Sequence, residues 1–224
     1  MRKVTVIIPT YHDWSRLNMC LGALEAQTYL AEFIEIIVVN NEPADPPVLI
    51  NYPDNLILIN ESKPGSYAAR NAALRVATGD IIAFTDSDCI PDSRWIELAV
   101  KRLEKGIENG IKRIAGGVEL FFDSNKLTAV QCYEKIFAFD QQAGALLGVS
   151  VTANMITWRD SFVSVGFFND SLMSGGDVEW GKRAHKLGLK IEYAPEVIVK
   201  HPARANLSDT LQKRRRVSGG VFKM

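Results

Sequence analysis

Runs of apolar residues alternate with amphipathic segments along the first hundred residues, and this alternation limits the fold more than any other feature of the sequence. The apolar runs have the length and composition of β-strands and cover residues 4–8, 33–39, 56–59 and 81–85. Between them, apolar residues recur at helical spacing in residues 15–27, 66–78 and 93–105. Because continuous apolar strands separated by helices are buried on both faces, the pattern predicts an α/β fold with a mostly parallel sheet and flanking helices.

The second half of the chain is less regular. Its expected strands are residues 113–122, 190–193 and 197–199, and its expected helices are residues 127–139 and a segment ending near residue 187. Residues 144–151 contain glycine and are expected to form a mobile loop. No internal repeat, low-complexity tract or clear linker divides the chain. We therefore expect a single domain over residues 1–201, with a small β subregion in its second half.

Charged residues balance over the whole chain but not at its end. The 224 residues contain 26 basic and 26 acidic side chains, so no overall field attracts nucleic acid. From residue 200 onward, seven basic residues face the single acidic Asp209. The tail over residues 202–224 is therefore either a solvated charge run or a site of peripheral contact with anionic lipid head groups, at ~1 kcal/mol per basic residue.

Cysteine usage and hydropathy bear on the cellular location. Cys20, Cys89 and Cys132 lie far apart without metal-type spacing, which indicates reduced thiols, each expected to be buried, in a cytoplasmic protein. No signal peptide opens the sequence, and no apolar run reaches ~18 residues, so no segment is expected to span a bilayer. We expect a cytoplasmic protein, with peripheral contact at the inner face of the membrane as the added role of the basic tail.

Two carboxylates separated by one residue, Asp86 and Asp88, follow the apolar run at residues 81–85. Side chains alternate faces along a strand, so both carboxylates point the same way if the extended backbone continues. Paired hard oxygen ligands suit a divalent cation such as Mg2+ or Mn2+, which shares its coordination with phosphates. The pair therefore indicates a metal-assisted site for a nucleoside diphosphate group, and the alternative is a polar turn after a buried strand.

Further polar residues follow the expected strands at the same edge of the sheet. Thr10, Asn40 and Asn41 fall, like Asp86, at carboxyl ends of strands, where parallel sheets bind ligands. The glycine-rich motifs of dinucleotide-binding and P-loop enzymes are both absent from the sequence, so diphosphate binding would depend on a cation and on side chains. Arg70 is the candidate side chain, because guanidinium binds phosphate oxygens bidentately, and its alternative role is a solvated helix charge.

Three more titratable residues lie in the second half. Asp177 and Glu179 follow two glycines at the start of an expected helix. A carboxylate there either complements the helix dipole or acts as a general base that takes a proton from an attacking hydroxyl. His201 ends the last expected strand, and while a lone histidine is more often structural, its imidazole can complete a metal shell.

Taken in order, these segments resemble the large family 2 of inverting glycosyltransferases with the GT-A fold. In the first half the resemblance is carried by residues 4–11 (VTVIIPTY), 35–41 (EIIVVNN), 65–71 (GSYAARN) and 85–88 (TDSD), and in the second half by residues 166–168, 176–179 and 193–201. It covers roughly residues 3–201, and the ordered combination of short motifs is highly specific. It implies a Rossmann-like sheet with a nucleotide-binding half over about residues 1–110 and an acceptor or catalytic half over about residues 111–201.

The resemblance also implies a role for each matching residue. The nucleotide-sugar would be bound by Pro9, Thr10, Tyr11, Asn40, Asn41, Glu42, Arg70 and Asp86. Asp88 would bind the metal, with His201 and Asp86 as further candidate ligands. Asp177 aligns with the catalytic base of the family, and Glu179 is the second candidate. Members commonly carry an aspartate where this chain has Asn40 and Asn41, which leaves the identity of the nucleotide base open.

The expected activity is transfer of a sugar from a nucleotide-diphospho-sugar, a UDP-sugar by default, to a hydroxyl of a glycan or lipid-linked acceptor, with inversion and with Mg2+ or Mn2+. Such a reaction belongs to polysaccharide or glycolipid synthesis. A metal-dependent nucleotidyltransferase is one alternative, but it would typically need a glycine-rich basic loop after the first strand, where this chain has Pro9, Thr10 and Tyr11. A non-catalytic nucleotide-sugar-binding protein is the other, against which the candidate base Asp177 argues.

Overall fold

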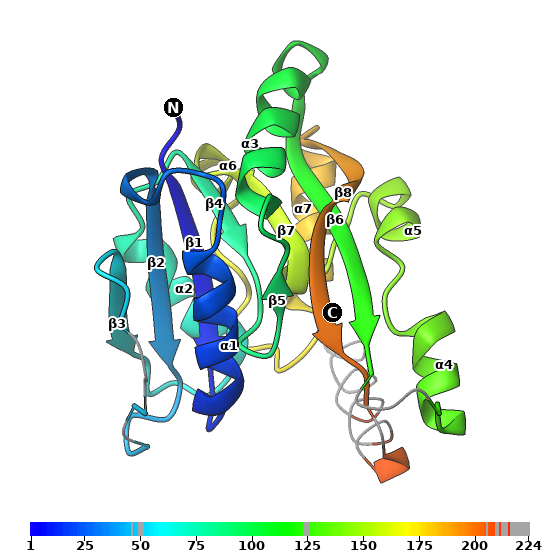
Figure 1. Cartoon of the computed structure of the whole chain (residues 1–224). Helices are drawn as coiled ribbons and strands as arrows, with labels where there is room; N and C mark the ends of the chain where they lie inside the picture. Colours follow the sequence, from blue (N-terminus) through cyan, green and yellow to red (C-terminus); the bar gives the residue numbers. More distant parts are fainter. Residues whose placement is uncertain are drawn as a thin grey trace.

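One sheet runs through both halves of the computed structural model, which describes residues 1–45, 47–48, 52–122, 126–204, 206–208, 211 and 215 (Figure 1). Within these residues the sheet has eight strands in the order β3-β2-β1-β4-β7-β6-β8-β5. They are β1 (Val4–Thr10), β2 (Ile34–Asn40), β3 (Leu56–Asn60), β4 (Ile81–Phe84), β5 (Ile90–Pro91), β6 (Ile111–Phe121), β7 (Met155–Trp158) and β8 (Lys190–Pro202).

The first half forms the parallel layer that its apolar runs predict. β1 pairs in parallel with β2 on one side and with β4 on the other, and β2 pairs in parallel with β3. Every residue of β2 and β4 is buried, as expected for strands covered on both faces. Thr10 lies opposite Asn40, and Asn40 lies opposite Asn60. The carboxyl ends of these strands therefore meet at one edge, and the predicted α/β fold with a mostly parallel sheet is confirmed.

A strand that the sequence analysis missed joins the two halves. The four-residue strand β7 pairs antiparallel with β4 and antiparallel with β6. Beyond it, β6 pairs in parallel with β8, whose outer edge holds the two-residue strand β5. The separate strands expected at residues 190–193 and 197–199 are one strand, β8, because a register shift opposite Gly116 and Gly117 absorbs the interruption.

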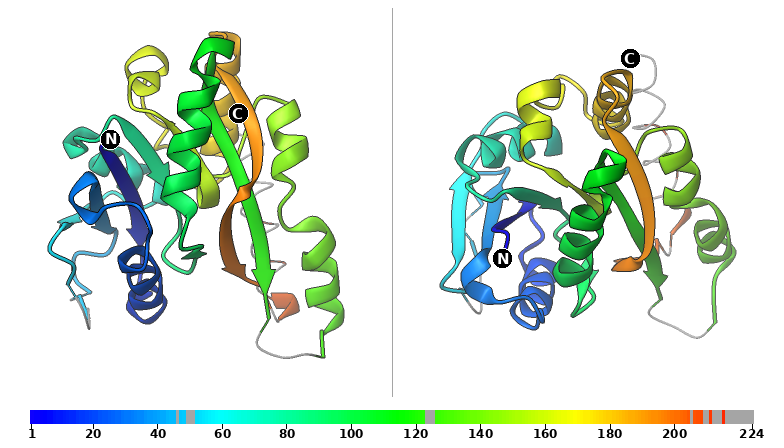
Figure 2. Two further views of the ribbon diagram at one scale, coloured as in Figure 1. Left: turned by 45° about the horizontal axis from the view of Figure 1, so that its top comes forward. Right: turned by 90° about the horizontal axis from the view of Figure 1, so that it is seen from above.

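Helices cover both faces of the sheet (Figures 1 and 2). Val6 and Ile8 pack on one face with residues of α1 and α3, including Trp95, whereas Ile7 packs on the other with residues of α2, α6 and α7, including Trp180. This alternation follows from the two-residue period of a strand. The helices are α1 (Trp14–Glu25), α2 (Ser66–Val76), α3 (Trp95–Gly106), α4 (Ala129–Phe137), α5 (Gln141–Leu146), α6 (Asp160–Val165) and α7 (Gly176–Lys186), with short 3-10 turns at Ala31–Phe33, Ile107–Asn109 and Thr152–Asn154.

Two local expectations are wrong. The loop expected over residues 144–151 begins inside α5, which packs against β6 and β8. Cys20 and Cys89 are buried as expected, but Cys132 on α4 is exposed. Within the described part of the chain, none of the helices combines the length and apolar character needed to cross a membrane.

Candidate active site

A cavity of about 720 Å³ opens where the parallel strands end. Its walls come from the segments that follow β1, β2, β3 and β4, from the start of α2, and from the end of β8. The predicted site residues that line it are Pro9, Thr10, Tyr11, Asn41, Glu42, Arg70, Asp86, Asp88 and His201. Among the described residues, Asn40, Asp177 and Glu179 do not line it. The edge of the sheet therefore brings together most, but not all, of the residues that the sequence singles out.

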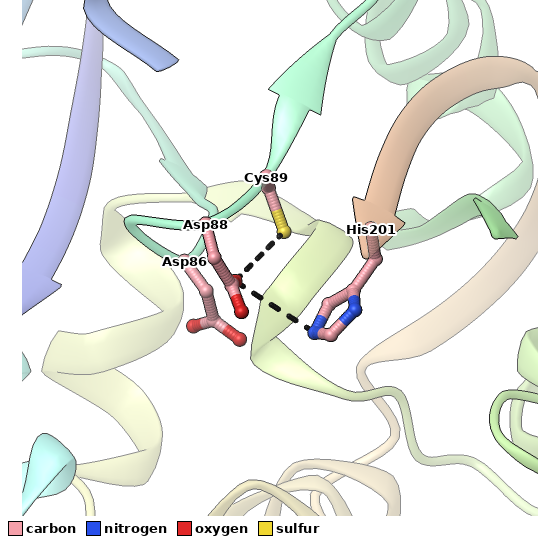
Figure 3. Close-up of side chains that lie close together, drawn as sticks. All are labelled: Asp86, Asp88, Cys89 and His201. Carbon is pink, nitrogen blue, oxygen red and sulfur yellow. Dashed lines mark hydrogen bonds and ion pairs between the residues drawn. The ribbon is translucent and has the colours of Figure 1, made fainter. Parts of the chain in front are cut away.

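Four side chains with ligand atoms converge on one side of this cavity (Figure 3). One ligand atom from each of Asp86, Asp88, Cys89 and His201 lies within 4.8 Å of all the others. The imidazole Nε2 of His201 is 3.7 Å from Oδ1 of Asp88. Two groups that bind one Mn2+ or Mg2+ ion at ~2.0–2.2 Å lie roughly 3–4.4 Å apart, so the distance between Asp88 and His201 fits a single ion.

A turn, rather than continued strand, places the two carboxylates together. The backbone N–H of Cys89 donates to the carbonyl oxygen of Asp86 at 3.1 Å, which closes a turn directly after β4. The alternation of side chains along an extended strand therefore does not extend to Asp88. Figure 3 nevertheless shows both carboxylates on the same side of the backbone, close to the His201 ring.

The chemistry of the four groups separates Cys89 from the others. Burial raises the pKa of the Cys89 thiol well above its ordinary value, and the neighbouring carboxylates of Asp86 and Asp88 add to this shift. The protonated thiol is a poor ligand for Mg2+ or Mn2+, which prefer oxygen. The residues that fit a hard divalent cation are therefore Asp86, Asp88 and His201.

The histidine is oriented for coordination through Nε2. Its other ring nitrogen, Nδ1, lies 2.8 Å from the carbonyl oxygen of Pro202. A carbonyl oxygen only accepts hydrogen bonds, so Nδ1 carries the proton and the lone pair of the neutral ring is on Nε2. Burial raises the pKa of Asp88, an effect that His201 opposes and Asp86 reinforces. A divalent cation beside these groups would favour the ionised carboxylate.

Arg70 of α2 contacts Asp86, one of the four clustered side chains. The guanidinium is buried, with 3% of the residue exposed, and its Nη2 donates to Oδ1 of Asp86 at 2.5 Å. The Nε of Arg70 is also buried and has no hydrogen-bond partner among the described residues. The side chain lies over the Tyr67 ring, at 5.6 Å from its centre. Arg70 therefore orients Asp86 and keeps donor capacity for a ligand, rather than extending into solvent.

The residues after β2 divide into two kinds. The amide of Asn40 donates to the carbonyl of Asp45 and accepts from the N–H of Glu42. The amide of Asn41 donates to the carbonyls of Glu61 and Lys63. Both asparagines therefore fix the shape of the loops that border the cavity. Glu42 also lines the cavity, and its carboxylate accepts a hydrogen bond from the backbone N–H of Ala44 at 3.4 Å.

Asp177 is buried at the first turn of α7, with 9% of the residue exposed. Its carboxylate accepts hydrogen bonds from the Tyr67 hydroxyl at 3.0 Å and from the backbone N–H of Thr152 at 3.2 Å. Thr152 itself lines the cavity, and Tyr67 also contacts Arg70. The carboxylate is therefore adjacent to the cavity wall and is connected to the Asp86 side of the site through Tyr67 and Arg70.

Glu179, the second base candidate, has a different environment. Its carboxylate pairs with Arg183 through two hydrogen bonds of 2.6 and 3.0 Å. Arg183 in turn donates to the backbone carbonyls of Val165 and Phe167. These contacts tie α7 to the segment that follows α6. Glu179 therefore serves to hold Arg183, whereas Asp177 contacts Thr152, a residue that lines the cavity.

Several lining residues were not identified by sequence reasoning. Arg204 lines the cavity and pairs with the buried Glu134 of α4 at 3.1 Å. Arg16 of α1 does not line the cavity, but its guanidinium lies 3.7 Å from the Asp88 carboxylate. Arg204 was visible only as one of many basic residues near the chain end, so no pattern distinguished it. Short polar residues of the loops also contribute, namely Asp13, Ser62, Ser66, Ser87, Thr152 and Ser174.

Comparisons with known proteins agree with this geometry. Residues 5–163 match the family described as Glycosyl transferase family 2. Glycosyltransferase AglE of Haloferax volcanii is 36% identical over 228 residues, which cover 99% of this chain and 73% of AglE. The pre-mycofactocin glycosyltransferase of Mycobacterium tuberculosis is 27% identical over 223 residues, and the match covers 95% of this chain but only 45% of that protein.

Solved structures show the same fold. Mannosyltransferase PcManGT from Pyrobaculum calidifontis, solved in complex with GDP-Man and Mn2+, superposes with a TM-score of 0.70 at 20% identity. The match covers 96% of this chain and 61% of that one. Residues 1–349 of TarS from S. aureus give a TM-score of 0.66 at 16% identity, covering 89% of this chain and 60% of that one. The fold is thus of the GT-A type. With the family match over residues 5–163 and the similarity to AglE along almost the whole chain, the protein belongs to glycosyl transferase family 2.

Proposed function

We propose that this chain transfers a sugar from a nucleotide-diphospho-sugar to a hydroxyl group, with inversion at the anomeric carbon. The observation that carries the proposal is the cavity that collects Asp86, Asp88, His201 and the buried Arg70 at the carboxyl ends of parallel strands. A glycan or lipid-linked acceptor is our proposal for the second substrate. A relative supports this class: WfgD of Escherichia coli, 30% identical over 121 residues, is described as a glucosyltransferase that acts on a diphosphoundecaprenol-linked sugar.

A divalent cation, Mg2+ or Mn2+, would be held by Asp88 and His201, with Asp86 as a further ligand. When bound, such an ion supplies positive charge that stabilises a departing diphosphate. Arg70 would donate to a phosphate oxygen through its unpaired Nε, while its Nη2 keeps Asp86 in place. The hydroxyl of Thr10, which is buried without a hydrogen-bond partner among the described residues, offers another polar contact beside the nucleotide.

The nucleoside would lie between the segments after β1 and β2. Pro9, Thr10 and the 61%-exposed Tyr11 form one wall, and Glu42 forms the other. A glutamate carboxylate accepts hydrogen bonds from ribose hydroxyls or from base N–H groups. We keep a UDP-sugar as the working donor. Asn40 and Asn41 act indirectly in this proposal, because their amides are engaged with the backbone.

Asp177 would be the general base. It would take the proton of the acceptor hydroxyl as the oxygen attacks the anomeric carbon, the new carbon–oxygen bond forms, and the bond to the diphosphate breaks with its electron pair. This single displacement inverts the anomeric centre and needs no covalent enzyme nucleophile. The first half of the chain, about residues 1–110, would thus bind the nucleotide, and residues 111–201 would supply the base and the acceptor side.

The free thiols of Cys20, Cys89 and Cys132 support a reducing, cytoplasmic location.

The test separates binding from turnover. A thermal-shift screen of nucleoside diphosphates with Mn2+ first identifies the nucleotide. Asp177→Asn should then lower sugar transfer by roughly 10²–10⁴-fold without changing the calorimetric affinity for that nucleotide, because the variant lacks only the base. Asp88→Ala should instead remove the Mn2+-dependent part of the affinity.

Asp160→Asn, on the exposed surface of α6, is the matched control and should change neither quantity. Loss of nucleotide affinity in Asp177→Asn would reject Asp177 as the base. An affinity of Asp88→Ala that equals that of the unaltered chain, with and without Mn2+, would reject the metal assignment.

A further inference from the structure

Helix α4 carries polar side chains inward and apolar side chains outward. Gln131 and Glu134 are only 4% and 3% exposed, whereas Ile136 and Phe137 are 70% and 64% exposed. A helix that packs only on its own protein shows the reverse arrangement, with its apolar stripe toward the core. The outward face of α4, with Ile136 and Phe137, therefore has the composition of a surface that binds another apolar surface.

Polar contacts fix this orientation. The Gln131 side chain completes a capping box with Thr128 at the start of α4. The carboxylate of Glu134 accepts a hydrogen bond from Arg204 at 3.1 Å. Turning the helix to bury Ile136 and Phe137 would break the Glu134–Arg204 pair and expose the polar groups that now hold α4 in place. The contacts of Gln131 and Glu134 therefore keep Ile136 and Phe137 exposed.

The exposed apolar residues continue beyond α4. Leu146 and Leu147 at the end of α5 are 83% and 74% exposed, and Leu207 and Leu211 after β8 are 62% and 51% exposed. In both Figure 1 and Figure 2, α5 follows α4 along the β6 side of the molecule, and the short helical turn at Leu207 lies beside α4. We call this set of six side chains the apolar rim: Ile136, Phe137, Leu146, Leu147, Leu207 and Leu211.

The charge of the residues near the apolar rim indicates which kind of surface the rim binds. From residue 200 onward the sequence has seven basic residues and one acidic residue, and the exposed Lys135 of α4 is also basic. Among the described residues, Lys135 precedes Ile136 in the sequence and Arg215 is four residues after Leu211, so two copies that met through the rim would bring like charges together, which is unfavourable. Anionic lipid head groups complement the same charge, and apolar side chains beside basic ones are typical of segments that lie in a membrane interface.

We propose that the apolar rim docks on an anionic lipid bilayer, with its side chains at the level of the head groups and the basic residues against lipid phosphates. Lys213, Arg214, Arg216 and Lys223 lie outside the described residues and enter the proposal only through their charge. Docking needs no sugar, nucleotide or divalent cation, so it stands independently of the proposed transfer reaction. Because Arg204 both lines the cavity and pairs with α4, docking would bring the cavity close to lipid-borne molecules.

Co-sedimentation of the full chain with vesicles tests the proposal. We expect binding to vesicles of phosphatidylcholine and phosphatidylglycerol in equal parts, weaker binding in high salt, and little binding to phosphatidylcholine alone. Phe137→Glu and Leu146→Glu should each lower the partition coefficient by about tenfold, because each loses apolar burial and adds negative charge. Val163→Glu, at an 86%-exposed position on α6, is the matched control and should bind like the unaltered chain.

A second readout uses the exposed Cys132 of α4. An environment-sensitive dye on this thiol should shift its emission to shorter wavelength when anionic vesicles are added. Thermal unfolding confirms that each variant is folded. Equal binding of Phe137→Glu and Val163→Glu would overturn the proposal. A dimer at sedimentation equilibrium without vesicles that Phe137→Glu dissociates would instead assign the rim to a second copy of the chain.

Discussion

At the scale of single residues, two hydrogen bonds from other segments fix the carboxylate of Asp177, the candidate base in the first turn of α7. Oδ1 of Asp177 accepts from the Tyr67 hydroxyl, and Oδ2 accepts from the N–H of Thr152. Burial raises the pKa of Tyr67, and the Asp177 charge adds to the shift, so the phenol stays protonated and donates. The close approach needs glycine at position 176, because a Cβ there would lie 2.8 Å from the Tyr67 ring.

Removing the phenol oxygen tests this arrangement. In Tyr67→Phe the ring that packs beneath Arg70 is retained, but one hydrogen bond to Asp177 is lost. We expect kcat to fall about tenfold with little change in nucleotide affinity, because one hydrogen bond to a charged group contributes about 1.5–3 kcal/mol and only part of it acts in turnover. Steady-state kinetics and calorimetry measure both. Tyr52→Phe, at an exposed position, is the control, and an equal kcat for the two variants would contradict the prediction.

A second residue-scale prediction concerns acid stability. Burial of Glu35 would raise the pKa of its carboxyl, but hydrogen bonds from Thr5 and Thr78 outweigh that effect and lower the pKa below its ordinary 4.5. A group with a depressed folded-state pKa stabilises the fold above its unfolded-state pKa, and this contribution is lost as the pH falls through the folded-state value. Glu35→Gln should therefore be less stable by about 1–2 kcal/mol at pH 7.

Urea denaturation between pH 7 and pH 3 measures that difference. The gap between Glu35→Gln and the unaltered chain should narrow below pH 4.5. Glu25→Gln, at an exposed position of α1, should follow the unaltered chain at every pH. A gap for Glu35→Gln that stays constant across this range would show that the carboxylate charge is not what stabilises the fold.

At the scale of secondary-structure elements, Arg113 connects three segments. It lies fully buried in β6 and donates to the carbonyl of Gly148 after α5 and to the carbonyl of Leu189 before β8. Its guanidinium also lies over the Trp180 ring of α7, at 5.8 Å. Burial lowers the pKa of Arg113 to about 10, so the group remains charged at neutral pH. The turn after α5 and the turn after α7 are thus both held to the sheet by one side chain.

Replacing this side chain should loosen those turns. Arg113→Met keeps the apolar stem but leaves two buried carbonyls without a donor, and we expect a loss of about 2–4 kcal/mol in the free energy of unfolding. The free energy of unfolding of Arg113→Lys should lie between those of the unaltered chain and Arg113→Met, because one ammonium cannot reproduce the planar arrangement of guanidinium donors. Urea denaturation measures the change, with Lys112→Met at the exposed neighbouring position as control. Equal stability of Arg113→Met and Lys112→Met would show that the carbonyls find other donors.

The strands differ in how well they could be predicted from the sequence. The apolar runs of β1, β2 and β4 carry an unambiguous strand signal, and the polar residues at their ends therefore locate the cavity. β7 is as short as β4, but its sequence includes the polar Thr157 and is therefore no continuous apolar run, and its antiparallel pairing depends on contacts distant in sequence. Cys89 and Tyr67 resemble ordinary core residues, and only the turn after β4 and the packing of α2 on α7 bring them to the site.

At the scale of the whole molecule, the two buried thiols report on global unfolding. Cys20 and Cys89 belong to the same core beneath α1 and α3, and burial raises the pKa of each. Thiolates are the reactive form, so both should resist maleimide in the folded protein, whereas the exposed Cys132 should react promptly. Mass spectrometry should show one modification in buffer and three in denaturant. Prompt modification of Cys89 in buffer would indicate that the part of the cavity lined by Asp86 and Asp88 opens locally.

The antiparallel strand β7 has a consequence for protein engineering. Because β4 is bonded to β1 along one edge and to β7 along the other, a fragment cut near residue 110 would end in a bare, apolar β-strand edge prone to intermolecular pairing. Chimeras that exchange the C-terminal part of the chain should therefore keep residues 155–158 with the parental N-terminal portion and place their crossover downstream of residue 158. A recombination library built on that boundary would preserve the turn bearing Asp86 and Asp88 in every member.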